Sequence, residues 1–134
     1  MWYAPMARRS QPIEIEMNFK IPVFAQLAGL LVLSNTFMTV AWYGHLKHKD
    51  KALLVVILIS WGIAFFEYLF QVPANRIGSS QFSVTQLKIV QECVSLSIFV
   101  IYAWFAFHEK LKWNTALALV LVGVAVYLVM LGRD

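Results

Sequence analysis

The sequence predicts an all-α membrane protein in which four transmembrane helices form an up-down bundle. Three observations lead to this prediction. The 134-residue chain is 60% hydrophobic and only 13% charged, whereas a soluble domain would carry about 25% charged residues. Its mean hydropathy is +0.69. The apolar residues are gathered into four blocks joined by short links.

Each apolar block approaches or exceeds the roughly 20 residues that a helix needs to cross the hydrocarbon core. The first and last blocks carry no charge, the second carries only Glu67, and the third carries Lys88 and Glu92 near its start. The blocks do not show the alternation of barrel strands. The predicted helices cover about residues 22–43, 52–72, 84–107 and 113–131.

Capping signals set the expected helix ends. Pro22 suits a first helical turn, where its missing N–H is not needed. Pro73 is expected to follow the end of the second helix. Ser83 and Gln86 have the spacing of a capping box at the start of the third helix. Because the links are short, neighbouring helices are expected to be antiparallel.

The chain divides into an N-terminal tail, residues 1–21, and a four-helix transmembrane domain, residues 22–134. The tail holds charges and prolines, lacks the apolar core of a signal peptide, and is interpreted as flexible or interfacial. The single cysteine, Cys93, excludes an intrachain disulfide.

Basic residues do not decide the orientation strongly. The two sides carry equal numbers of Lys and Arg, so insertion in both orientations is one expectation. Weighting residues close to helix ends predicts instead that both termini lie outside the cytoplasm. The two sets are Lys47, Lys49, Lys51, Lys110 and Lys112 against Arg8, Arg9, Lys20, Arg76 and Arg133.

A polar stripe runs along the second helix. Ser60, Glu67 and Gln71 share one face because their spacing follows the helical repeat. An ionised carboxylate in a bilayer costs at least about 2.5 kcal/mol, so such residues usually face the bundle interior and carry function. Glu67 is therefore the first candidate for a substrate or proton site, with Gln71 and Ser60 beside it.

Lys88 and Glu92 form a second polar stripe at the start of the third helix. A rise of 1.5 Å per residue places Glu67 about 8 Å and Glu92 about 12 Å from helix ends on the same side. Lys88 could pair with either carboxylate, as part of the site or of a buried structural network. Asn35, deeper on the first helix, completes the candidate site.

Asn75 and Arg76 are expected at a loop mouth beside this site. Arg76 could contact a phosphate-like headgroup, pair with Glu67 or remain solvated; the last is commonest for a lone arginine.

Other function classes find no support in the sequence. No nucleophile–base pair, phosphate loop or zinc-protease motif occurs, so neither an enzyme nor a cofactor is expected. The histidines lack the supporting ligands of a metal site and are interpreted as solvated. No basic stripe indicates nucleic-acid binding. The histidines are His45, His48 and His108.

The fourth helix is a candidate for dimer contact. Ala116 and Gly123 are seven residues apart, and small residues at such spacing let helices approach closely in lipid. Lipid-facing filler explains the same pattern.

Several stretches closely resemble an uncharacterised family of four-helix membrane proteins in the drug/metabolite transporter superfamily. They are "LSNTFMTVAWYGHLKHK", "ISWGIAFFEYLFQVPANRIG", "FSVTQLKIVQE" and "FHEKLKWN". The resemblance implies a transporter-like fold in a bacterial-type inner (plasma) membrane. Small multidrug exporters, the best-understood relatives, are dimers with an essential glutamate in the first helix. This chain has no acid there, so that mechanism cannot be carried over.

Two functions remain. One is a transporter of a small polar or cationic solute, proton-coupled through Glu67 and completed by an antiparallel homodimer, since four helices are too few to enclose a path. The other is a non-transporting scaffold or a subunit of a larger membrane assembly. A cavity at Glu67 favours the first, and a packed Glu67–Lys88–Glu92 network favours the second.

Overall fold

Four long helices form the part of the chain that the structure describes, residues 22–132 of a computed structural model. No strand occurs in this range, so the predicted all-α class is confirmed. The tail, residues 1–21, lies outside the described residues. The helices are α1 (Val23–Tyr43), α2 (Leu53–Gly78), α3 (Val84–Phe107) and α4 (Trp113–Leu131), and a short 3-10 helix, η1 (Gly44–Lys47), follows α1.

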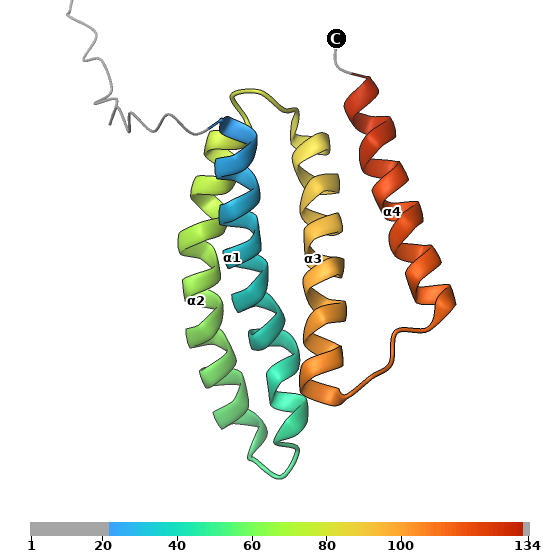
Figure 1. The fold of residues 1–134 in the computed structure, drawn as a ribbon. Coiled ribbons are helices and arrows are strands. Elements are labelled where there is room, and N and C mark those ends of the chain that lie inside the picture. Colours follow the sequence, from blue (N-terminus) through green and yellow to red (C-terminus); the bar gives the residue numbers. More distant parts are fainter. Residues whose placement is uncertain (1–21, 133–134) are drawn as a thin grey trace, which may run out of the picture.

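The helices run alternately in opposite directions, with α1 between α2 and α3 (Figure 1). α1 packs against both of these neighbours, whereas α4 packs against α3 at the outside of the row. The α1–α2 and α3–α4 connections lie at one end, and the α2–α3 connection lies at the other. α1 is thus the helix on which the arrangement is centred.

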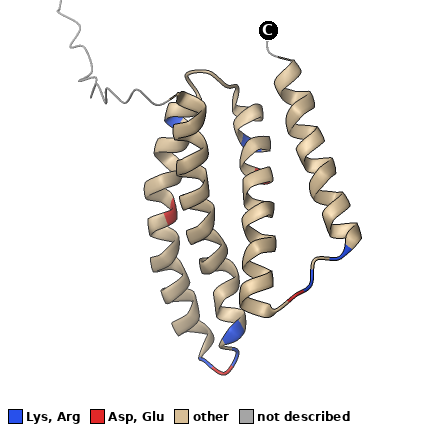
Figure 2. Ribbon diagram, viewed as in Figure 1, with Lys and Arg blue, Asp and Glu red and all other residues tan. Residues whose placement is uncertain are grey.

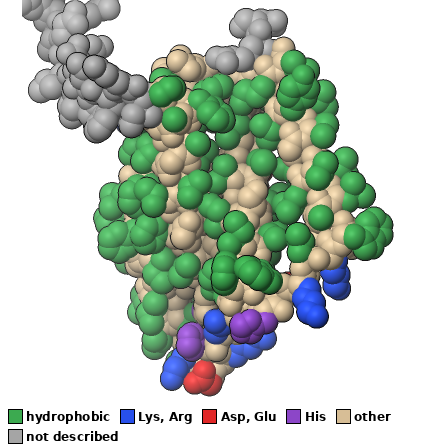
Figure 3. Space-filling model, viewed as in Figure 1, with side chains coloured by type: hydrophobic (Ala, Val, Ile, Leu, Met, Phe, Trp, Pro, Cys, Tyr) green, Lys and Arg blue, Asp and Glu red, His purple; other side chains and the backbone are tan. Residues whose placement is uncertain are grey.

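The surface of the described chain is that of a multi-pass membrane protein. All four helices are long and apolar enough to span a membrane. Hydrophobic side chains cover most of the face shown in Figure 3. Charged residues gather at the α1–α2 and α3–α4 connections, and few lie along the helices (Figure 2). The exposed apolar side chains of α2 and α4 are therefore suited to contact with lipid.

The hydrophobic core lies toward the end with the α2–α3 connection. Leu27 and Leu31 of α1 are fully buried there. They pack with residues from α2, α3 and the connection between them: Ala74, Phe82, Leu87 and Val90. This cluster holds three helices together at one end of the row.

The predicted capping box at the start of α3 is confirmed. The backbone N–H of Gln86 donates to Ser83 Oγ at 3.2 Å, and the backbone N–H of Ser83 donates to Gln86 Oε1 at 2.9 Å. Gln86 also donates from Nε2 to the carbonyl of Val129 at 3.1 Å. One side chain therefore both starts α3 and ties it to α4.

The expectation that the second helix ends before Pro73 is wrong, because α2 continues through Pro73 to Gly78. A proline inside a helix removes one backbone hydrogen bond and costs about 3 kcal/mol. Packing offsets this cost, since Ala74 is fully buried and Gly78 lies against Leu27 and Leu87. Asn75 and Arg76 consequently belong to the last turn of α2 and not to a loop.

Gly78→Val should destabilise the fold. A Cβ at this position would come within 2.5 Å of Leu87 Cδ2 and 3.1 Å of Leu27 Cδ1, and overpacking of this kind costs about 1–3 kcal/mol. Gly62→Val is the matched control, because a Cβ there meets nothing within 4 Å. Thermal unfolding in detergent should show a lower midpoint for Gly78→Val alone. Equal midpoints for the two variants would contradict the close packing of α2 against α1 and α3.

Candidate functional site

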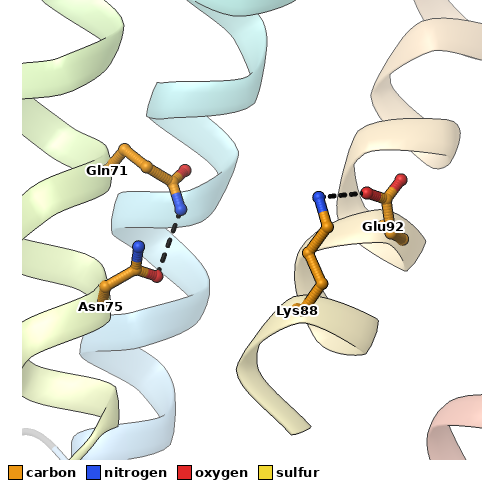
Figure 4. Close-up of polar contacts among 4 residues, drawn as sticks. All are labelled: Gln71, Asn75, Lys88 and Glu92. Carbon is orange, nitrogen blue, oxygen red and sulfur yellow. Dashed lines mark hydrogen bonds and ion pairs between the residues drawn. The ribbon is translucent and has the colours of Figure 1, made fainter. Parts of the chain in front are cut away.

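A chain of polar side chains joins α1 to α2, and we call Glu67, Ser34, Gln71 and Asn75 the polar chain. Ser34 Oγ lies 2.7 Å from Gln71 Oε1 and 3.5 Å from Glu67 Oε1, within hydrogen-bonding reach of both. Gln71 Nε2 donates to Asn75 Oδ1 at 3.2 Å (Figure 4). The polar chain thus runs along α2 with Ser34 as its contribution from α1.

Helical spacing and aromatic packing bring these side chains together. Glu67, Gln71 and Asn75 are four residues apart and share one face of α2. On α1, Ser34 is fully buried and continues the face that begins with the core leucines. Beside it, Phe37 stacks on two rings of α2, those of Phe66 and Phe70, with centroids 5.8 and 5.7 Å away. These ring contacts hold Ser34 of α1 in register with the polar side chains of α2.

Asn35, which follows Ser34 in α1, leaves a buried hydrogen-bond acceptor unpaired within residues 22–132. The side chain is fully buried, and its Nδ2 donates to the carbonyl of Leu31 at 2.8 Å. Its Oδ1 finds no partner among the described residues. A buried acceptor left unpaired costs about 1–3 kcal/mol. Asn35 can therefore accept a hydrogen bond from a water molecule or a bound solute.

Lys88 pairs with Glu92 on its own helix. Lys88 Nζ lies 2.5 Å from Glu92 Oε1, and the two side chains are 63% and 50% exposed. Figure 4 shows the pair on α3, across the ribbon of α1 from Gln71 and Asn75 on α2. The structure therefore brings Lys88 and Glu92 together and leaves Glu67 to Ser34. Among the described residues, Lys88 meets the polar chain only at Asn75, with which it lines a pocket.

The remaining candidates are spread over the molecule. Ser60 of α2 lines a pocket of about 300 Å³ near η1, together with Ala41 and His45, and lies away from Gln71. Arg76 lines a different pocket at the other end of α2. On α4, Ala116 is partly exposed, and Gly123 is exposed to open space. Residues 22–132 contain no group of three or more side chains that could hold a metal ion.

Ser34 is the member of the polar chain that the sequence reasoning missed. On the first helix the sequence predicts Asn35, and not Ser34, as a residue of the site. A signal was present, because Leu27, Leu31 and Ser34 follow the i, i+4, i+7 spacing of one buried helix face. A serine that continues such a buried face is placed to hydrogen-bond a side chain of a neighbouring helix.

The sequence matches a known protein family over most of its length. A family model described as "Putative member of DMT superfamily (DUF486)" matches residues 27–130, from the start of the core in α1 to the end of α4. Nothing matches among curated proteins or among solved structures. The matched range covers the polar chain, the Lys88–Glu92 pair and all four helices. By this match, the chain belongs to the DUF486 family of membrane proteins.

Proposed function

We propose that the protein transports a small solute and that the polar chain is its solute and proton site. The observation that carries this proposal is the hydrogen-bonded run of Glu67, Ser34 and Gln71 between two membrane-length apolar helices. Ionisable groups in such segments usually mark solute or proton pathways. Membership in a family assigned to the drug/metabolite transporter superfamily supports the same function.

Ser34 has a single hydroxyl hydrogen, and this links the hydrogen bonds of the site to proton binding at Glu67. A serine hydroxyl has one hydrogen to donate, yet both Gln71 Oε1 and Glu67 Oε1 lie within reach of it. When Glu67 is protonated, its own O–H can donate to Ser34 Oγ while Ser34 donates to Gln71. When Glu67 is ionised, Ser34 turns its hydrogen to the carboxylate, and Gln71 Oε1 loses its donor. Proton loss at Glu67 thus frees an acceptor on Gln71 for a solute.

The groups at the site suit a polar or cationic solute. Glu67 offers a carboxylate, Gln71 an amide oxygen, and Asn35 an unpaired buried oxygen. All three accept hydrogen bonds, so the solute they bind best carries N–H or O–H donors. A proton on Glu67 removes the negative charge that would hold a cation, which gives exchange of one proton for one cationic solute.

We further propose that the transporter is an antiparallel homodimer in a bacterial-type inner membrane. A transport path commonly lies between two inverted repeats, and one chain supplies a single set of four helices. Exposed apolar faces on α2 and α4 offer surface for a second copy. The even division of basic residues permits insertion in both orientations.

The geometry does not form the network that the non-transporting alternative predicts. Nor is Glu67 a lining residue of any of the four pockets described in residues 22–132, although the transport hypothesis predicts a cavity there. That alternative called for a packed, dry network of Glu67, Lys88 and Glu92. Lys88 and Glu92 instead pair with each other, at least half exposed, and Glu67 has an uncharged partner on α1.

Glu67→Gln should abolish pH-dependent solute binding. Glutamine keeps the shape and hydrogen bonding of the site but cannot titrate. A panel of organic cations and polar solutes, screened on purified protein at acidic and alkaline pH, should bind the wild type in a pH-dependent way. The variant should assemble normally and bind at least about 10-fold more weakly, which corresponds to about 1.4 kcal/mol.

Two further variants separate proton coupling from charge alone. Glu92→Gln, which removes a carboxylate outside the polar chain, should keep the pH dependence. Ser34→Ala should weaken it, because the link between Glu67 and Gln71 is lost. Thr36→Ala is its matched control, since Thr36 is exposed and donates only to the Val32 carbonyl at 2.7 Å. Full activity and unchanged pH dependence in Glu67→Gln would assign Glu67 a structural role.

Termini should be accessible from outside the cytoplasm, or from both sides in a mixed population. The lysine-rich α1–α2 and α3–α4 connections should then face the cytoplasm. Labelling of tags at each terminus in intact cells measures this directly. A uniformly cytoplasmic location of both termini would contradict the weighting of the connection lysines.

Gly123→Leu should weaken self-association, because a large side chain blocks close approach of α4 to a second copy. Crosslinking in bilayers should show a dimer for the wild type and a smaller dimer fraction for the variant. Leu121→Ala, on the exposed surface of the same helix, controls for general changes to α4. A monomeric wild type, or an unchanged dimer fraction in Gly123→Leu, would remove α4 from the proposed interface.

A further inference from the structure

A pocket of about 340 Å³ lies where the end of α2 faces the start of α3. Arg76 and Asn75 line it from α2, and Lys88 and Gln91 line it from α3. Two cations on different helices thus border one space. Within residues 22–132, Arg76 forms no ion pair, and Lys88 pairs with Glu92, which does not line the pocket. The two cations and Glu92 together leave a net positive charge.

The side chains that line the pocket have more hydrogen-bond donors than the acceptors that they already contact can use. A guanidinium group has five N–H donors and an ammonium group has three, and Glu92 accepts from Lys88. Asn75 has its Oδ1 engaged by Gln71 Nε2, which leaves its own Nδ2 to donate. Three donor groups around a positive space suit an anion with several acceptor oxygens, and a phosphate group has this chemistry.

The pocket lies near the ends of two helices that are long enough to span a membrane, where headgroups are expected. Arg76 lies two residues before the end of α2, and Lys88 lies in the second turn of α3. At 1.5 Å per residue these positions are about 3 and 6 Å from the helix ends. Val84 and Leu87 add an apolar wall. From the donors, the charge and this depth, we infer that the pocket binds a phosphate group, supplied by an anionic phospholipid headgroup or by free phosphate.

Native mass spectrometry of the full chain in uncharged detergent tests this inference. The probes are phosphatidylglycerol, phosphatidylcholine and inorganic phosphate, each measured against chloride at equal ionic strength. Arg76→Gln should weaken phosphatidylglycerol binding about 5-fold, as expected for one basic residue near a membrane surface. Lys88→Gln should have a similar effect, and Lys88→Arg should retain binding because it keeps the charge. Lys110→Gln, which removes one charge in the α3–α4 connection, is the matched control and should change nothing.

The outcomes separate the two sources of phosphate. Displacement of phosphatidylglycerol by inorganic phosphate, beyond the effect of chloride, supports free phosphate as a ligand of the same pocket. Arg76-dependent binding of phosphatidylglycerol without such displacement supports the lipid headgroup. Equal affinity for phosphatidylcholine, equal losses in Arg76→Gln and Lys110→Gln, or no binding of any probe would overturn the inference. Asn75 is common to the pocket and the polar chain. None of the substituted residues belongs to the polar chain, so failure of this inference can be distinguished from failure of the proposed transport function.

Discussion

A polar side chain in the hydrocarbon core must take its hydrogen bonds from the protein, and α1 meets this need for α2. Ser34 provides the contact to Glu67 and Gln71. The same helix places Leu27 and Leu31 in the core that joins α1, α2 and α3. The polar contact with α2 and the apolar packing among α1, α2 and α3 therefore both depend on where α1 lies. A shift of this helix would change both together.

The helices themselves could be predicted because length and hydropathy are local properties of the sequence. The bounds of α3 agree with the expected range, and the Ser83–Gln86 capping box explains why its start was predictable. The end of α2 could not be predicted in the same way. Pro73 gave the correct local signal, but packing of Ala74 and Gly78 against other helices outweighs it. Rules that consider only neighbouring residues in the sequence do not include such packing against other helices.

The sequence predicted which residues of α2 share a face, but not their depth in the helix or their neighbours on other helices. The helical repeat places Glu67 and Gln71 on one face, and the structure joins both to Ser34. The predicted depth of Glu67 was wrong, because α2 ends at Gly78 and not before Pro73. Glu67 therefore lies about 16.5 Å from the end of its helix and not about 8 Å. Neither the helical repeat nor a residue count says which helix stands beside which. Glu67 and Glu92 were expected at similar depth, with Lys88 one turn nearer the surface and able to pair with either. However, α1 lies between α2 and α3. The expected network of Glu67, Lys88 and Glu92 does not form, and the expectation failed because the sequence did not reveal which helices are neighbours in the bundle.

This lateral separation has a chemical consequence for Glu67. Had Lys88 reached it, the ion pair would hold the carboxylate in its charged form, because an opposite charge nearby favours ionisation. Lys88 is instead engaged by Glu92, one turn along its own helix. Glu67 is left with Ser34, whose hydroxyl can donate or accept. A partner that serves either protonation state lets the carboxyl group gain and lose its proton without breaking the contact between α1 and α2.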